Sequence, residues 1–170
     1  MCWKNDLEYF KLQISKKDIG VYKVICWDTK IHYLRSWFYK CNYLDAFKSA
    51  QYSKISFEEV YNFVMGSEGF HSYIMLPYIY NDGISANYSF YKRYSSRIPL
   101  VVKCYIPKNA LYASNGKEVI SSAIKFEKII PISELVHVIG TTQDLNFEEE
   151  YNDAYEYLCA IINSNKKELI

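Results

Sequence analysis

The fold of this chain is decided by its most strand-like segment, Ile98-Pro99-Leu100-Val101-Val102-Lys103-Cys104-Tyr105-Ile106-Pro107. β-Branched and aromatic residues fill this segment, and a proline stands near each end, which is typical of a β-strand. We therefore expect residues 98–106 to form the clearest strand of the molecule.

Other segments share this enrichment in β-branched and aromatic residues and are bounded by glycine, proline or turn residues. We expect strands over residues 21–27, 69–76, 118–120 and 124–132. Residues 21–27 are largely apolar on both faces, so we expect a central strand there. Ser114-Asn115-Gly116 is typical of a hairpin turn that leads into residues 118–120.

Helices are predicted by capping residues and by apolar periodicity. Ser56 begins a reciprocal capping pattern, and Gly66 ends the helix that follows. Residues 85–94 are expected to form a short helix. The last helix follows a cap at Asp144 or Asn146, and its buried stripe is expected to consist of Tyr151, Ala154, Tyr155, Leu158 and Ile162.

The order of these elements predicts an α+β fold: a single compact domain with a mostly antiparallel, partly split sheet flanked by helices. We expect that domain to span residues 1–170. Residues 1–17 form a lead-in segment and residues 164–170 a C-terminal tail, whereas residues 31–54 are assigned to mixed strand and loop.

Composition narrows the class of function. The chain has 170 residues, 50% of them apolar, and a domain of this size buries about two thirds of its unfolded surface. Its 20 Lys and Arg nearly balance 19 Asp and Glu, so no global field favours generic nucleic-acid binding. The 18 tyrosines either reflect an AT-rich genome or form a stacking or protein-binding surface.

The five cysteines are odd in number, widely spaced and free of CxxC pairs, so we expect buried free thiols and a reducing, cytoplasmic location. No signal-peptide pattern and no apolar run of about 18–20 residues is present, so no membrane association is expected. No metal site is predicted. The Gly-rich phosphate loop, GxSxG and HExxH motifs are absent, which disfavours NTPases, serine hydrolases and zincins.

Three residues stand where chemistry is feasible, and each has a structural alternative. His71 lies in Gly69-Phe70-His71-Ser72-Tyr73, between a glycine that allows close backbone approach and two hydroxyl residues that can orient its ring, and the alternative is a satisfied structural histidine. Glu118 begins a strand after a turn, where it either faces a cleft or is solvated. Lys23 lies within an apolar strand, so it either reaches solvent or meets a partner such as an anionic ligand.

Several motifs resemble a family of small uncharacterised proteins from Bacteroides-type bacteria and their phages. They are Gly69-Phe70-His71-Ser72-Tyr73, Val102-Lys103-Cys104-Tyr105-Ile106-Pro107-Lys108, Tyr112 and Gly116-Lys117-Glu118-Val119-Ile120-Ser121, with Met1-Cys2-Trp3-Lys4 and Val21-Tyr22-Lys23-Val24. The resemblance covers most of residues 1–132. It implies a phage or mobile-element setting but no known activity.

The order of these motifs also resembles the ADP-ribosyltransferase fold, whose members split NAD at the nicotinamide bond. The resemblance implies Glu118 as the catalytic carboxylate, assisted by His71. It implies NAD contacts for Lys23 with the adjacent Tyr22, and for Ser72 and Tyr73 near the nicotinamide. Lys23 stands where the family has Arg or His, and lysine cannot make a bidentate contact.

Three functional hypotheses therefore remain. The first is an accessory protein that binds a host macromolecule through aromatic anchors, for example to inhibit a bacterial defence system. The second is an ADP-ribosyltransferase-like enzyme that depends on Glu118. The third is a domain that holds a nucleotide near His71 without turning it over.

Overall fold

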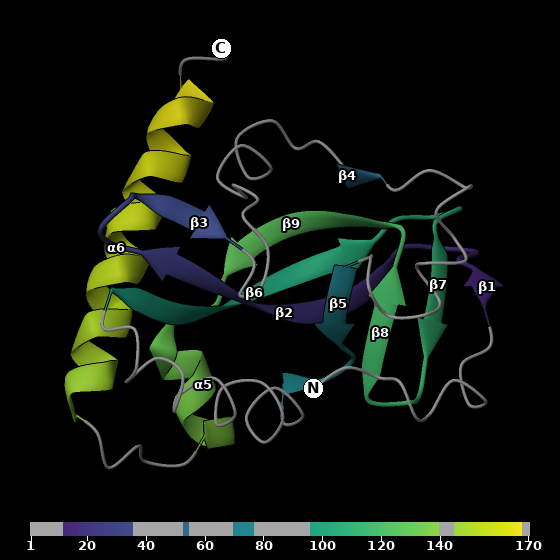
Figure 1. Ribbon diagram of the computed structural model, residues 1–170, viewed down its shortest axis with the longest axis horizontal. Helices are drawn as coiled ribbons and strands as arrows, with labels where there is room; N and C mark the ends of the chain where they lie inside the picture. The colour runs from purple at the N-terminus through teal and green to yellow at the C-terminus, as the bar shows by residue number, and fades with distance from the viewer. Residues whose placement is uncertain (1–11, 36–52, 55–69, 77–95, 140–144, 168–170) are drawn as a thin grey trace.

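The computed structural model describes residues 12–35, 53–54, 70–76, 96–139 and 145–167, and Figure 1 shows their arrangement. These ranges form strands and helices with the bounds β1 Gln13–Ile14, β2 Ile19–Asp28, β3 Tyr33–Arg35, β4 Ser53–Lys54, β5 Phe70–Tyr73, β6 Arg97–Ile106, β7 Leu111–Ser114, β8 Glu118–Ser121, β9 Ala123–Ile129, α5 Ile132–Ile139 and α6 Leu145–Lys167. The helices predicted to follow Ser56 and to span residues 85–94 lie outside the described residues.

The strands form one antiparallel sheet in the order β1-β7-β8-β5-β2-β6-β9-β4, with β3 also paired to β2. The expected α+β domain with a mostly antiparallel sheet is therefore confirmed. α6 stands across the ends of β2, β3 and β6, and the β7–β8 hairpin lies at the other end of the sheet (Figure 1).

β2 is the central strand, as predicted. β6 pairs with one edge of it over all ten residues, from Ile19 opposite Ile106 to Asp28 opposite Arg97. The other edge is divided, because β5 meets it at Tyr22 and β3 meets it from Cys26 to Asp28. Two different strands therefore continue the sheet from the two halves of this edge.

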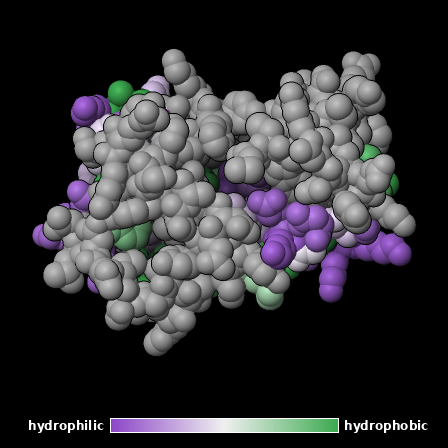
Figure 2. All heavy atoms as spheres, turned by 60° about the horizontal axis from the view of Figure 1, so that its bottom comes forward, coloured by the Kyte–Doolittle hydropathy of each residue, from purple (hydrophilic) through white to green (hydrophobic). Residues whose placement is uncertain are grey.

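The core lies on this central pair of strands. Val21 and Ile25 of β2 and Leu100, Val102 and Cys104 of β6 are all fully buried. Burying an aliphatic side chain of this size contributes about 1.5–3 kcal/mol relative to leaving it exposed. On the face shown in Figure 2, the described residues are mainly hydrophilic, with only small hydrophobic areas between them.

Pro99 lies inside β6 rather than at its end, where the sequence pattern placed it. The β6–β9 pairing begins at Val102, and the N–H of Val101 points to the same edge of β6. Because alternate N–H groups of a strand point to the same edge, the missing N–H of Pro99 falls on the stretch where β9 does not pair. The strand therefore tolerates this proline without losing a hydrogen bond to β2.

α6 is joined to the sheet through Tyr151. The Tyr151 hydroxyl accepts a hydrogen bond from the N–H of Val101 at 3.1 Å and donates one to the carbonyl of Ile130 at 2.7 Å. It lies where β9 leaves β6, so it satisfies two backbone groups that strand pairing no longer serves. The predicted stripe is confirmed: Tyr151, Ala154 and Leu158 are buried, and Tyr155 and Ile162 pack against the core.

Several boundaries differ from the sequence prediction. The strand expected over residues 69–76 ends at Tyr73. The strand expected over residues 124–132 ends at Ile129, and α5 begins at Ile132, because Pro131 cannot donate to a ladder and suits the start of a helix. α6 runs through Lys167, so it extends into the expected tail. β1 lies within the expected lead-in segment and pairs with β7.

Candidate functional site

The six residues that the sequence singled out lie on three neighbouring strands. Tyr22 and Lys23 belong to β2, His71, Ser72 and Tyr73 to β5, and Glu118 to β8. Tyr22 is paired with Tyr73, and Tyr73 is paired with Glu118. Since directly paired residues of antiparallel strands project from the same face, these three side chains form a row across the sheet.

Lys23 and Ser72 project from the opposite face, because consecutive side chains of a strand alternate. They are only 6% and 1% exposed. The Lys23 Nζ donates a hydrogen bond to the carbonyl of His71 at 2.7 Å, and the Ser72 hydroxyl donates one to the carbonyl of Val119 at 3.4 Å. Lys23 therefore fastens β5 to β2 beyond their single paired position, and it does not face the side from which Glu118 projects.

His71 is held in its neutral form. Burial lowers its pKa from an ordinary value of 6.5 to about 4, and the positive charge of Lys23 adds to this effect. At neutral pH the imidazole therefore carries no charge and is a weak base. This environment fits the structural alternative for His71 better than it fits general-base chemistry near pH 7.

Glu118 is positioned by the predicted hairpin turn, which the structure confirms. The Asn115 side-chain oxygen accepts hydrogen bonds from the N–H groups of Lys117 and Glu118 at 2.9 and 2.8 Å. Gly116 has a φ of 91°, which a residue without a Cβ adopts readily. The turn thus fixes the backbone of Glu118 at the start of β8, with its side chain partly exposed.

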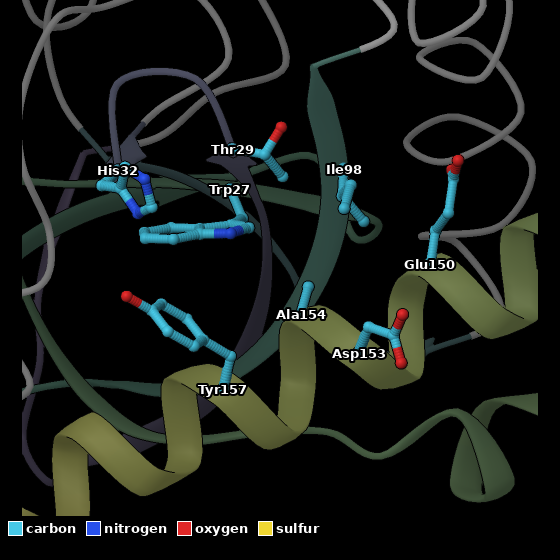
Figure 3. A pocket seen from close by; sticks show the side chains of 8 residues that line it. All are labelled: Trp27, Thr29, His32, Ile98, Glu150, Asp153, Ala154 and Tyr157. Carbon is cyan, nitrogen blue, oxygen red and sulfur yellow. The ribbon is translucent and has the colours of Figure 1, made fainter.

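A second site lies between the β2–β3 turn and α6. Its pocket encloses about 450 Å³, and its lining consists of Trp27, Thr29, His32, Ile98, Glu150, Asp153, Ala154 and Tyr157 (Figure 3). In the close-up view, the Trp27 ring lies beside His32 and beside the Tyr157 ring that rises from α6. Trp27 is 4% exposed and Tyr157 is 47% exposed, so a buried ring and an accessible ring meet here.

The three rings are in mutual contact. The ring centroids of Trp27 and Tyr157 are 5.6 Å apart, those of Trp27 and His32 are 5.8 Å apart, and those of His32 and Tyr157 are 6.3 Å apart. These separations lie within the range in which aromatic pairs attract each other. The rings therefore hold one another in place and form a continuous aromatic wall.

The turn that carries His32 is firmly anchored. The Asp28 carboxylate accepts a hydrogen bond from the N–H of Lys30 at 3.2 Å and lies 3.4 Å from the Arg97 guanidinium, and the N–H of Thr29 donates to the carbonyl of Ser96 at 2.8 Å. His32 itself has a φ of 54°, a left-handed conformation that costs a residue with a Cβ about 1–2 kcal/mol. The fold thus maintains a strained residue at the mouth of the pocket.

The polar side of the pocket is acidic. Glu150 and Asp153 both line it, and no Lys or Arg is among the described residues that do so. The Glu150 Oε2 atom is buried and has no hydrogen-bond partner within the described part of the chain. A buried acceptor without a donor costs about 1–3 kcal/mol, so this oxygen favours a ligand that brings an N–H group.

Sequence reasoning missed this second site. The neighbours of His32 in the sequence suggest no chemistry, so sequence reasoning did not single it out. One signal was present: Glu150, Asp153, Ala154 and Tyr157 follow the i, i+3, i+4, i+7 spacing of one helix face. That face shares Ala154 with the buried stripe, but the sequence does not reveal that the β2–β3 turn packs against it.

The criteria for metal-ligand clusters and for membrane-spanning helices identify no further site among the described residues. Among residues 12–35, 53–54, 70–76, 96–139 and 145–167, no three His, Cys, Asp or Glu side chains are grouped as metal ligands. No helix within these ranges is long and apolar enough to span a membrane.

Comparisons of the chain with protein-family models, curated proteins and solved structures found no match.

Proposed function

We propose that this protein acts by binding a host protein, in the setting of a phage or mobile element, through the pocket formed by Trp27, His32 and Tyr157. We propose the cytosol of the bacterial host as its location and inhibition of a defence system as the outcome. The single observation that carries the proposal is the half-exposed Tyr157 ring held against the buried Trp27 ring.

An exposed aromatic ring that packs against other rings is better suited to anchor a partner than an isolated aromatic ring on the surface is. Tyr and Trp dominate binding energy at protein interfaces when they sit in well-packed pockets. Because Trp27 and His32 already contact Tyr157, little side-chain freedom remains to be lost when a partner binds. Folding has therefore already ordered the side chains that a partner would contact.

The location is supported by the state of the cysteines. Cys26 and Cys104 are buried free thiols, and Cys159 is a free thiol that is half-buried. Burial raises the pKa of the Cys104 thiol far above its usual value, so this sulfur stays protonated and unreactive. Free thiols of this kind are typical of a reducing compartment.

Affinity capture from host lysate tests the proposal. Wild-type protein, Tyr157→Ala and Tyr33→Ala are immobilised and the captured proteins are compared. Tyr33 is the matched control, because it is equally exposed at 47% but does not line the pocket. We expect a captured protein that Tyr157→Ala loses and Tyr33→Ala retains. Equal capture by both variants, or no capture by wild type, would contradict the proposal.

A second candidate function is the binding of NAD or a related nucleotide in an ADP-ribosyltransferase-like manner. It is favoured by the row of Tyr22, Tyr73 and Glu118, which offers aromatic faces and a carboxylate on one side of three adjacent strands. Lys23 does not contribute a clamp in this proposal, since its ammonium group is buried against the His71 carbonyl. Glu118 is the carboxylate that would stabilise positive charge developing on the ribose.

Calorimetric titration with NAD distinguishes this candidate from the first. We expect saturable binding that Glu118→Gln weakens and Glu127→Gln leaves unchanged, since Glu127 is an exposed carboxylate on β9. A flat titration at millimolar NAD would rule out the nucleotide candidate without affecting the protein-binding proposal.

A further inference from the structure

We infer that the pocket between the β2–β3 turn and α6 takes a guanidinium group, the side chain of an arginine on the partner protein. The inference rests on the proposed function and specifies the ligand chemistry of the same site. Its evidence is the combination of the aromatic wall formed by Trp27, His32 and Tyr157 with the carboxylates of Glu150 and Asp153.

The charge of the lining selects a cation. Glu150 and Asp153 of α6 bring carboxylates to the pocket, and no lysine or arginine of the described chain lines it to neutralise them. The faces of Trp and Tyr rings attract cations through their quadrupole, and this attraction strengthens when water is excluded. Aromatic faces and carboxylates therefore act in the same direction.

The buried Glu150 oxygen selects a cation that donates several hydrogen bonds. Oε2 of Glu150 is excluded from solvent and has no partner among the described residues, so it gains most from a donor that enters the pocket. Asp153 lies three residues further along α6, on the same helix face. A guanidinium group has five N–H donors in a rigid fork, so it can donate more than one hydrogen bond to a carboxylate.

The aromatic wall favours guanidinium over ammonium. The Trp27 and Tyr157 rings are tilted by 42° with centroids 5.6 Å apart, and the accessible ring is that of Tyr157, which is 47% exposed. Planar guanidinium stacks on such surfaces and is more weakly hydrated than an ammonium group. The volume of about 450 Å³ is in the lower part of the range for ligand sites and suits one long side chain.

The test uses the indole N–H signal of Trp27 in two-dimensional NMR spectra, identified among the three tryptophans by its loss in Trp27→Phe. The probe is N-acetyl-arginine methylamide, and the uncharged citrulline analogue, which has nearly the same shape, is its control. We expect a saturable shift with a dissociation constant on the order of millimolar for the arginine probe. The citrulline probe should bind at least tenfold more weakly.

A matched pair of variants tests the carboxylates. Glu150→Gln/Asp153→Asn should weaken arginine-probe binding at least tenfold, which corresponds to about 1.4 kcal/mol. Glu149→Gln/Glu156→Gln removes the same charge from exposed positions of α6 that do not line the pocket, and it should leave binding within about twofold. Thermal unfolding of both variants checks folding, and Asp153→Asn alone carries the test if the first variant is unstable.

Three results would overturn the inference: no shift with the arginine probe, equal shifts with the citrulline probe, or equal weakening in the two double variants. Failure of this inference is distinguishable from failure of the proposed function. If partner capture depends on Tyr157 but is unchanged in Glu150→Gln/Asp153→Asn, the pocket binds a protein and the guanidinium assignment is wrong.

Discussion

Removal of the Tyr151 hydroxyl should destabilise the protein far more than removal of any exposed tyrosine hydroxyl. In Tyr151→Phe, the N–H of Val101 and the carbonyl of Ile130 lose hydrogen bonds of 3.1 and 2.7 Å inside the core. Burial raises the pKa of the Tyr151 hydroxyl well above its usual value, so the wild-type group stays protonated and able to donate. Each buried backbone group left without a partner costs about 1–3 kcal/mol, so we expect the two groups together to cost about 2–6 kcal/mol.

Urea unfolding measures this loss as a shift in midpoint at constant m-value. For a domain of this size, 3 kcal/mol corresponds to a decrease in Tm of roughly 6–12 °C. The control is Tyr112→Phe, which removes a hydroxyl from an exposed 2.9 Å hydrogen bond to Gln13 and should cost about 0.5 kcal/mol or less. The explanation is wrong if the two variants lose the same stability.

Three further predictions concern single residues. The unfolded chain binds a proton at His71 near pH 6.5, whereas the folded chain binds it only near pH 4. The free energy of unfolding should therefore fall by up to about 3 kcal/mol as pH decreases between these values. Urea midpoints at pH 7.5 and 4.5 should show this dependence in wild type and not in His71→Gln. His32→Gly should be about 1 kcal/mol more stable than His32→Ala, because only alanine keeps a Cβ at a φ of 54°; equal urea midpoints would argue against strain. Iodoacetamide should label Cys159 in the native protein before Cys26 and Cys104, as peptide mass spectrometry will tell, because the latter two are fully buried.

Much of the sheet was predictable because its strands carry strong local signals. The apolar runs of β2 and β6, the Asn115-Gly116 turn before β8 and the periodic stripe of α6 each depend on residues close together in the sequence. α5 was missed because Ile129 and Ile132 continue the apolar pattern of β9, and Pro131 alone marks the change. β1 is too short for any local pattern to indicate it, since it depends on pairing with β7.

The candidate sites were predictable only in part. Tyr22, Tyr73 and Glu118 do lie side by side, because the strands that carry them are neighbours in the sheet. The buried position of Lys23 was one of two alternatives that the sequence left open, and its actual partner, the His71 carbonyl, is a backbone atom that no motif marks. The Trp27–Tyr157 contact joins residues that are 130 positions apart in the sequence, and no local pattern predicts such a contact.

That separation has a consequence for the life of the protein in the cell. One part of the pocket lining comes from Trp27 and His32, whereas another comes from α6, between Glu150 and Tyr157. During synthesis the pocket therefore does not exist until α6 has emerged and docked, and a chain that stops earlier lacks it. Any ligand that fills the pocket also holds α6 against the sheet, so binding raises the stability of the whole fold by mass action. Proteolytic protection of α6 would then report occupancy of the site.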